Sequence, residues 1–364
     1  MRISDFKKRQ LRNGFKNVSE LRQDLVSGDW MIVATGRAKR PDLFIKREKE
    51  KFEQSISECP FEDPQAAGHG EPLLIYYKND KRRRLKGIKK LVKEWSLQVV
   101  KNKYPYLGPG DCSKIYREGP YTLMDGAGFN EVIITRDHKK HLALMSLNGV
   151  EEVIKSYQER YLALMNHKCV NYVFIFHNHG LKAGASIPHP HSQIIALPVI
   201  PADVRRSIRG AKEYHDEHRR CAHCLMLEWE KEERRCVFQN EHFIVFAPFV
   251  PRVNFELRIY PREHQSNFEK ITEIERKYLA EALWQALFRL YKGLKDPSYN
   301  FFIHTAPCDG KDYKYYHWHI EILPKTATWG GIELGTGVEI LLVKPEDVAK
   351  YLRKIKIDKN ARRA

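Results

Sequence analysis

Residues 178 to 198 read Asn-His-Gly-Leu-Lys-Ala-Gly-Ala-Ser-Ile-Pro-His-Pro-His-Ser-Gln-Ile-Ile-Ala-Leu-Pro. A polar loop rich in glycine runs directly into the segment His-Pro-His-Ser-Gln at 189–193, and an apolar run follows at once. This order predicts a loop that leads into a strand with histidines at its entrance. Because residues i and i+2 share a face of a strand, His189, His191 and Gln193 are expected on one side.

The loop before these histidines has the glycines that allow a backbone to approach a phosphate closely. The alternative for such a stretch is a plain turn before a strand that carries surface histidines. Three aligned polar side chains behind a loop of glycine, serine and asparagine favour a binding or catalytic role instead.

The second half of the chain repeats the pattern of the first. Residues 317–324 read His-Trp-His-Ile-Glu-Ile-Leu-Pro and echo the histidine motif of the first stretch. The spacing supports the match, because His138 and His189 are 51 positions apart while His264 and His317 are 53 apart. The repeat predicts an α+β fold made of a duplicated unit, each half a largely antiparallel sheet with a long helix.

Hydrophobic patterning places the elements of both halves. The expected strands are 29–35, 95–105, 129–135, 172–176, 255–260 and 299–303, together with the two histidine strands. The expected helices are 150–165, 201–220 and 271–290. The domains are predicted as a basic N-terminal arm at 1–20, an N-terminal half with the catalytic motif at 21–200, and a C-terminal half with a zinc site at 201–364.

Composition limits the class of protein. A chain of 364 residues with 42% apolar residues can bury a sizeable core, and a formal net charge of +17 favours anionic partners such as nucleotides, sugar phosphates or nucleic acid. The alternative explanation for the basic runs at 7–16 and 78–93 is that they are solvated surface and bind no anionic partner. No signal peptide and no apolar run long enough for a membrane span is found, so we expect a cytoplasmic protein without membrane contact.

Cysteine usage points to metal binding in a reducing compartment. The count of seven is odd, and only Cys221 and Cys224 lie close in sequence. Cys221-x-x-Cys224 with the distant His264 and His317 fits a tetrahedral zinc site. The alternative is a pair of buried thiols near surface histidines.

The motif His189-Pro-His191-Ser-Gln193 resembles the signature of galactose-1-phosphate uridylyltransferases, the transferase branch of the histidine-triad superfamily. The Gly-Ala-Ser and Ala-Leu-Pro flanks resemble the ADP-glucose phosphorylase-like members, and the resemblance covers roughly residues 20–345. It implies that the two sheets join into one half-barrel. It also implies transfer of a nucleotidyl group through a covalent intermediate on His191, in two displacements with ping-pong kinetics.

The resemblance implies roles for further residues. Gln193 would donate a hydrogen bond to the nucleotidyl phosphate, and an amide cannot act as general acid or base. The implied substrate-binding residues are Arg37, Arg40, Asn102, Asn178, Gly180, Ser186 and Lys325. The segment 329–337, Trp-Gly-Gly-Ile-Glu-Leu-Gly-Thr-Gly, would contribute to a hexose-phosphate site across a homodimer interface, although a simple surface turn explains it equally well.

The resemblance also implies a structural zinc site in each half. The first would consist of Cys59, Glu62, His138 and His189, where family members often have a second cysteine at the position of Glu62. Carboxylate is a harder ligand, so this site could hold zinc weakly, use another ligand or be empty. His304 and His319 are spare candidates near the second site, and Ser207 stands where some members have a glutamate that helps to bind iron.

The leading hypothesis is uridylyl transfer from a UDP-hexose to a hexose 1-phosphate, with the nucleotide-sugar and the sugar phosphate as partners. The alternative passes an adenylyl group from ADP-glucose to inorganic phosphate. A more remote alternative is a zinc-stabilised nucleic-acid-binding protein. The sequence argues against the last, because it has no aromatic RNA-binding motif and no short-spaced zinc finger.

Overall fold

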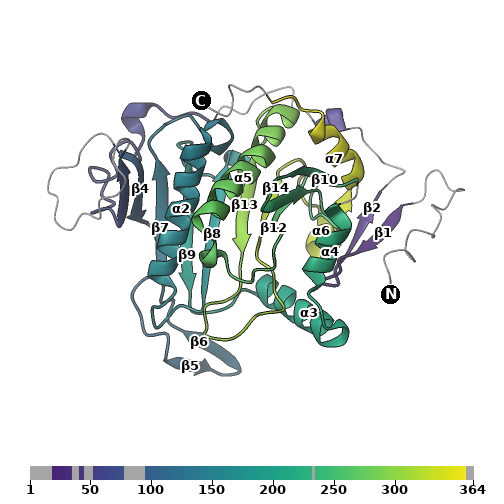
Figure 1. Ribbon diagram of the computed structural model, residues 1–364. Coiled ribbons are helices and arrows are strands. Elements are labelled where there is room, and N and C mark those ends of the chain that lie inside the picture. Colours follow the sequence, from purple (N-terminus) through teal and green to yellow (C-terminus); the bar gives the residue numbers. More distant parts are fainter. Residues whose placement is uncertain (1–18, 35–40, 45–51, 78–94, 232–233, 358–364) are drawn as a thin grey trace, which may run out of the picture.

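A ten-stranded antiparallel sheet forms the centre of the molecule (Figure 1). The computed structural model describes residues 19–34, 41–44, 52–77, 95–231 and 234–357. Predictions that concern the N-terminal arm, Arg37, Arg40 and the basic run 78–93 lie outside these residues. Across the sheet the strands are β10 (Cys236–Gln239), β11 (Phe243–Phe246), β12 (Leu257–Pro261), β14 (His319–Pro324), β13 (Tyr299–His304), β8 (Tyr172–His179), β9 (His191–Leu197), β7 (Phe129–Thr135), β4 (Trp95–Lys101) and β3 (Leu74–Tyr77).

The order of the strands is symmetric about the border between β8 and β13. Outward from this border, β8, β9, β7, β4 and β3 in one half correspond to β13, β14, β12, β11 and β10 in the other. Neighbouring strands are antiparallel throughout, including the joining pair β8 and β13. The predicted duplication and the joining of two antiparallel sheets into one are therefore confirmed.

Two long helices cover one face of this sheet, one from each half (Figure 1). They are α2 (Leu147–Leu164) and α5 (Glu273–Leu294), as the helical periodicity predicted. Ser146 caps α2 by accepting a hydrogen bond from the Gly149 amide, and Thr272 and Glu275 form a reciprocal capping box at the start of α5. Because the helices occupy one face, side chains on the other face are left for a site.

Smaller elements surround the sheet. The helices are α3 (Ala202–His218), α4 (Ala222–Lys231), α6 (Gly331–Thr336) and α7 (Pro345–Arg353), and the short 3-10 helices are η2 (Pro41–Phe44), η3 (Ile56–Glu58), η4 (Leu142–Leu144), η5 (Leu181–Ala183) and η6 (Phe268–Lys270). Strands β5 (Ile115–Glu118) and β6 (Tyr121–Met124) form a separate hairpin. None of the helices in the described part of the chain is long and apolar enough to cross a membrane.

The two ends of the described chain meet in a three-stranded sheet. Strands β1 (Glu20–Gln23) and β2 (Trp30–Val33) pair with β15 (Ile340–Leu341). Lys344 forms an ion pair with Glu20 at 2.6 Å, and Glu346 binds the buried Arg22. These early residues thus pack with the end of the chain, and the domain boundaries given above stay a prediction.

Two predictions about strand limits and one about the C-terminal segment were wrong. Strands β9 and β14 both begin at the second histidine of their motif, so His189 and His317 precede the strands. In the first motif the cause is Pro190, which has no backbone N–H for the ladder. The segment 329–337 is not a simple surface turn, because residues 331–336 form α6 and the Gly330 amide binds the Glu333 carboxylate at 2.9 Å.

The structure also contains a disulfide that cysteine usage did not predict. Cys112 and Cys169 are bonded although 57 positions separate them, and Cys59, Cys221, Cys224, Cys236 and Cys308 are free thiols. The bond links the segment before the β5–β6 hairpin to the segment before β8. Disulfides are uncommon in reducing compartments, so this finding weakens the argument from cysteine usage, and the cytoplasmic location stays a prediction.

Candidate active site and metal centres

His191 lies on the open face of the sheet, opposite the helices. Its neighbour Ser192 shares a 2.6 Å hydrogen bond with Tyr157 of α2, so the side chains on either side of Ser192 point the other way. The Nδ1–H of His191 donates to the His189 carbonyl at 2.9 Å, which leaves Nε2 with its lone pair. Burial lowers the pKa of His191 below its ordinary value, because the charged form loses hydration. The imidazole is therefore neutral at pH 7.

Gln193 lies two positions after His191, and hydrogen bonds between side-chain amides hold it in place. Its oxygen lies 3.4 Å from Nδ2 of Asn130, and the Asn130 oxygen accepts from Nδ2 of Asn102 at 3.0 Å. Because the Gln193 oxygen faces Asn130, its amide nitrogen remains as a donor toward a ligand. Asn130 thus lies between Asn102 and Gln193 and contacts both side chains. This places Asn102 near the site where the resemblance expected it.

A cavity of about 800 Å³ is lined by residues of β8, β13 and β14, and neither His191 nor Gln193 is among its lining residues. Phe176 lines it and is the cross-strand partner of Gln193, so the two side chains share a face. Asn178 and Lys325 also line the cavity, and burial together with the charge of Arg252 lowers the pKa of Lys325. The apolar wall and the cationic end suit a ligand with a flat ring and phosphates.

Asn178 belongs to the end of β8, since this strand is three residues longer than expected. Its side-chain oxygen accepts from Nδ2 of Asn300 on β13 at 2.7 Å, which leaves its amide nitrogen as a donor. The pairing of β8 with β13 thus orients a residue of the first half through a residue of the second. Sequence reasoning missed Asn300, because no local motif surrounds it.

Gly180 and Ser186 lie in the loop between β8 and β9. Gly180 has φ of +81°, and a Cβ there would come 2.3 Å from the Ser298 hydroxyl, so close packing against β13 explains this glycine. Ser186 is exposed to solvent. Gly180 lines a second cavity, of about 390 Å³, and its role in phosphate binding stays a prediction.

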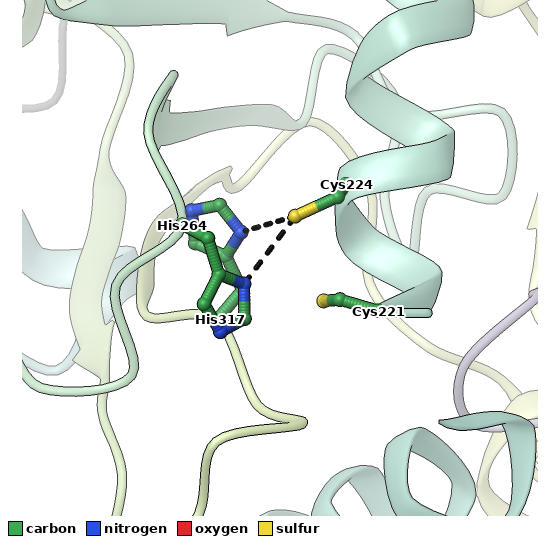
Figure 2. A group of neighbouring side chains, drawn as sticks. All are labelled: Cys221, Cys224, His264 and His317. Atoms are coloured by element: carbon green, nitrogen blue, oxygen red, sulfur yellow. Dashed lines mark hydrogen bonds between the residues drawn. The ribbon is translucent and has the colours of Figure 1, made fainter. Parts of the chain in front are cut away.

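Cys221, Cys224, His264 and His317 converge as the sequence predicted (Figure 2). Their ligand atoms all lie within 4.8 Å of one another. The Sγ atom of Cys224 is 3.3 Å from Nδ1 of His264 and 3.7 Å from Nδ1 of His317. A hydrogen bond from the Cys224 thiol holds the pKa of Cys221 well below its usual range. The donor set and its charge fit tetrahedral zinc.

Cys59, Glu62, His138 and His189 form the corresponding cluster of the first half. Nδ1 of His138 lies 3.0 Å and Nδ1 of His189 3.4 Å from the same Glu62 oxygen, and Sγ of Cys59 is 3.4 Å from Nδ1 of His189. The other Glu62 oxygen accepts from Arg136 at 2.7 Å. The side chains therefore fit a cation here as well, although with one thiolate fewer.

The four histidines of these clusters share one orientation. In each, Nε2–H donates to a main-chain carbonyl, and Nδ1 faces the other ligands. The carbonyl partners of His138, His189, His264 and His317 are Gln54, Thr135, Lys314 and Pro261, at 3.0, 2.6, 2.8 and 3.1 Å respectively. Lone pairs that converge in this way repel one another, and a bound cation removes that repulsion.

The sequence had indicated His304 and His319 as spare ligands near the cysteine cluster. In the structure they do not belong to that cluster. They form a separate group with Glu321, whose oxygens lie 3.5 Å from Nε2 of His304 and 3.7 Å from Nε2 of His319. The buried Arg258 binds Glu321 at 3.2 Å. The reason is that His317 lies before β14, whereas His319 is the first residue of that strand, so the regular i, i+2 arrangement does not extend to His317.

Comparison with known proteins supports this picture. The family described as "Galactose-1-phosphate uridyl transferase, N-terminal domain" matches residues 12–201, and a domain of unknown function matches residues 128–363. An ADP-glucose phosphorylase of Arabidopsis thaliana is 32% identical over 343 residues, 93% of each chain. A galactose-1-phosphate uridylyltransferase of Thermotoga maritima is 30% identical over 350 residues, 93% of this chain and 99% of the relative.

Solved structures agree with the sequence comparison. The Arabidopsis thaliana ADP-glucose phosphorylase with bound ADP-glucose superposes with a TM-score of 0.74 at 29% identity, over 93% of this chain and all of that one. A uridylyltransferase structure gives 0.68 at 26% identity, over 92% and 97%. Because the family model matches more than half of the chain and two relatives are 30% or more identical over 93% of it, the chain belongs to the galactose-1-phosphate uridyl transferase family.

Proposed function

We propose that this nucleotidyltransferase moves a uridylyl group from a UDP-hexose to a hexose 1-phosphate, with His191 as the covalent nucleophile. The observation that carries the proposal is the state of this imidazole. It is neutral, its Nδ1–H is bound to the His189 carbonyl, and its Nε2 is directed away from that bond beside a neutral amide. A neutral nucleophile approaches the anionic α-phosphate without charge repulsion.

In the first displacement, Nε2 of His191 attacks the α-phosphorus, and the bond from phosphorus to the bridging oxygen breaks. The electron pair of that bond leaves with the hexose 1-phosphate. Nε2 carries no proton to lose, and the positive charge of the ring is stabilised through Nδ1–H by the His189 carbonyl. In the second displacement, a phosphate oxygen of the acceptor attacks phosphorus and the bond to nitrogen breaks.

Binding of the substrate phosphates is assigned to side chains around the same strand. Gln193 and Asn178 each offer an amide donor, and Lys325 offers a positive charge in the cavity of about 800 Å³. Arg37 and Arg40 are assigned to neutralising the diphosphate, as the family resemblance implies. Phosphoryl transfer depends chiefly on positioning and charge stabilisation, which these groups supply.

We assign structural zinc to Cys221, Cys224, His264 and His317, where the ion would cross-link α4 with the segments before η6 and β14. The same role at Cys59, Glu62, His138 and His189 would fix the loop that carries Phe61, whose ring centroid lies 5.0 Å from that of His191. Neither ion takes part in the displacements, because four protein ligands fill the coordination sphere.

A second candidate function is ADP-glucose phosphorolysis, in which inorganic phosphate accepts an adenylyl group and ADP is released. The Arabidopsis thaliana relative with that name is 32% identical to this chain, against 30% for the Thermotoga maritima uridylyltransferase. The covalent step is the same in both functions. The two therefore differ in the base and the acceptor, and not in the nucleophile.

The deciding experiment uses UDP-glucose and ADP-glucose, each radiolabelled at the α-phosphate, in separate incubations with the protein. Label retained on denatured protein identifies the donor. Addition of galactose 1-phosphate or inorganic phosphate should then release the label as a UDP-sugar or as ADP. If neither donor leaves an acid-labile label on the protein, the covalent intermediate is contradicted. The same labelling is measured with His191→Ala, and His319→Ala serves as its matched control.

We also propose a homodimer that meets at the β5–β6 hairpin. Five large hydrophobic side chains of this hairpin are exposed, namely Ile115, Tyr116, Tyr121, Leu123 and Met124. An exposed apolar group of this kind is typical of an interface. Light scattering after size exclusion should give twice the chain mass, and Leu123→Lys with Tyr121→Lys should give the monomer. A monomeric wild type would contradict the proposal.

A further inference from the structure

A third group of metal-ligand side chains lies outside both clusters described above. It consists of His141, His179 and Asp296, whose ligand atoms all lie within 4.8 Å of one another. His141 immediately precedes η4, His179 ends β8, and Asp296 follows the end of α5. Three segments that are far apart in sequence thus meet at one point, on the helix side of the sheet.

The distances within the group match the edges of a coordination sphere. Nε2 of His179 is 2.9 Å and Nε2 of His141 is 3.5 Å from the same Asp296 oxygen, Oδ1. Zinc bonds to nitrogen and oxygen of about 2.0–2.2 Å place neighbouring ligands about 3.0–3.5 Å apart. Both imidazoles therefore direct the same nitrogen at one carboxylate, at separations that a shared ion requires.

The backbone at Asp296 is bent to hold this position. Lys295 and Asp296 have φ of 56° and 61°, in the left-handed region that residues with side chains rarely adopt. The Asp296 amide binds the Tyr291 carbonyl at 2.8 Å and closes the end of α5. Two consecutive residues in this conformation turn the chain sharply, and the turn directs the carboxylate toward the histidines.

The group also has open space beside it. A cavity of about 390 Å³ is lined by all three side chains and by Lys139 and Lys295. It is separate from the cavity of about 800 Å³, because the two share no lining residue. Three protein ligands with an open position toward a cavity are typical of a metal site that also binds water or an anion, whereas structural sites are closed.

We propose that His141, His179 and Asp296 bind a divalent transition-metal ion of the zinc class, with water in the open position. Two imidazoles and one carboxylate form a donor set that suits zinc and other first-row divalent ions. In the absence of metal, Oδ1 of Asp296 accepts a hydrogen bond from Nε2–H of His179 at 2.9 Å, which holds these two side chains together. The ion would join the last residue of β8 to the end of α5, directly before Gly180 and the loop that leads to His191.

The test measures zinc in the full-length protein after dialysis against buffer with a fixed concentration of unbound zinc. Asp296→Asn keeps the size of the side chain and tolerates positive φ, but it removes the charged ligand. We expect this variant and His179→Ala to bind one zinc ion fewer per chain than the wild type. Affinity for that ion should fall about 100-fold or more. His218→Ala, an exposed histidine of α3, is the matched control and should retain the wild-type zinc content.

Anomalous diffraction at the zinc edge, from wild-type crystals prepared in the same buffer, locates the ion without any variant. A peak between the two imidazoles and the carboxylate would support the proposal. Absence of that peak would overturn it, and so would Asp296→Asn protein with the same zinc content as the wild type. Thermal unfolding of each variant verifies that a loss of zinc reflects the site and not unfolding.

Discussion

Strands β9 and β14 occupy equivalent places in the two halves, yet their surroundings differ in charge. In both, the second histidine donates Nδ1–H to the carbonyl two residues earlier, at 2.9 Å for His191 and 3.1 Å for His319. Two positions on, the first strand has neutral Gln193 and the second has Glu321. The backbone geometry is the same in both strands. The side chain two positions after the histidine differs in charge.

The difference in charge supports the proposal that only the first half carries out nucleotidyl transfer. Glu321 lies 3.7 Å from Nε2 of His319 and 3.2 Å from the buried Arg258, so the second half already has an anion beside its histidine. An anionic phosphate that approached His319 would meet a carboxylate, whereas at His191 it meets an amide donor. Burial lowers the pKa of His319 to about 4, so this ring stays neutral and supplies no compensating charge. A repeated fold therefore does not imply a repeated activity.

The largest expected effect comes from removing the nucleophile. His191→Ala should reduce nucleotidyl transfer by about 10⁴-fold or more, because the covalent route is lost while binding remains. Initial rates with the donor identified by labelling, together with the yield of labelled protein, measure the loss.

The equivalent change in the other half sharpens the comparison. His319→Ala should leave the yield of covalent label close to that of the wild type, because this ring faces Glu321 and not Gln193. The proposed division between the halves would be wrong if His319→Ala abolished labelling in a folded protein or if His191→Ala retained it.

The next effect concerns the two metal clusters. Cys221→Ala should release firmly bound zinc and lower the free energy of unfolding by about 3–4 kcal/mol, the stabilisation expected when unbound zinc exceeds Kd about 100- to 1,000-fold. Cys59→Ala should lower it less, because the first cluster has Glu62 in place of a second thiolate. Metal analysis and denaturant unfolding at a fixed zinc concentration measure both.

Glu62→Cys makes the first cluster resemble the second and tests the same contrast in the opposite direction. Its affinity for zinc should rise about tenfold or more, since thiolate is a softer ligand. An equal loss of stability from Cys59→Ala and Cys221→Ala would show instead that the carboxylate makes no difference.

A smaller effect is expected from pH. Burial lowers the pKa of His191, so the ring stays neutral below the ordinary value of about 6.5 and is protonated only at more acidic pH. The rate of single-turnover labelling should therefore be nearly constant at pH 6.5–8 and fall only below that range. A midpoint above 6.5 would mean that the ring is stabilised as a cation, which contradicts its role as a neutral nucleophile.

The sequence predicted the duplication because the two histidine motifs and their spacing are local patterns. It predicted the cysteine cluster for the same reason, since each ligand lies in a recognisable motif. Asp296 and Asn300 could not be found in this way, because their contacts arise only when α5 and β13 pack against the first half. The Cys112–Cys169 bond escaped prediction because loops bring its partners together, and loops have no periodicity.

The smallest expected effect comes from changing Gln193, and it tests most directly the difference between β9 and β14. Gln193 can donate to the phosphate of the intermediate but cannot transfer a proton, so it cannot activate water near the nucleotidyl group. Gln193→His would introduce a group that titrates near pH 6.5 at this point. We expect transfer to slow a few-fold, about 1 kcal/mol of barrier, while a larger share of the intermediate is hydrolysed to the nucleoside monophosphate. Product analysis with and without acceptor measures the ratio of hydrolysis to transfer. Gln193→Asn, an amide that is one carbon shorter, controls for the change in side-chain length. If Gln193→His and the wild type give the same ratio of hydrolysis to transfer, the neutral amide does not protect the intermediate. The contrast with Glu321 would then concern the binding of the phosphate alone.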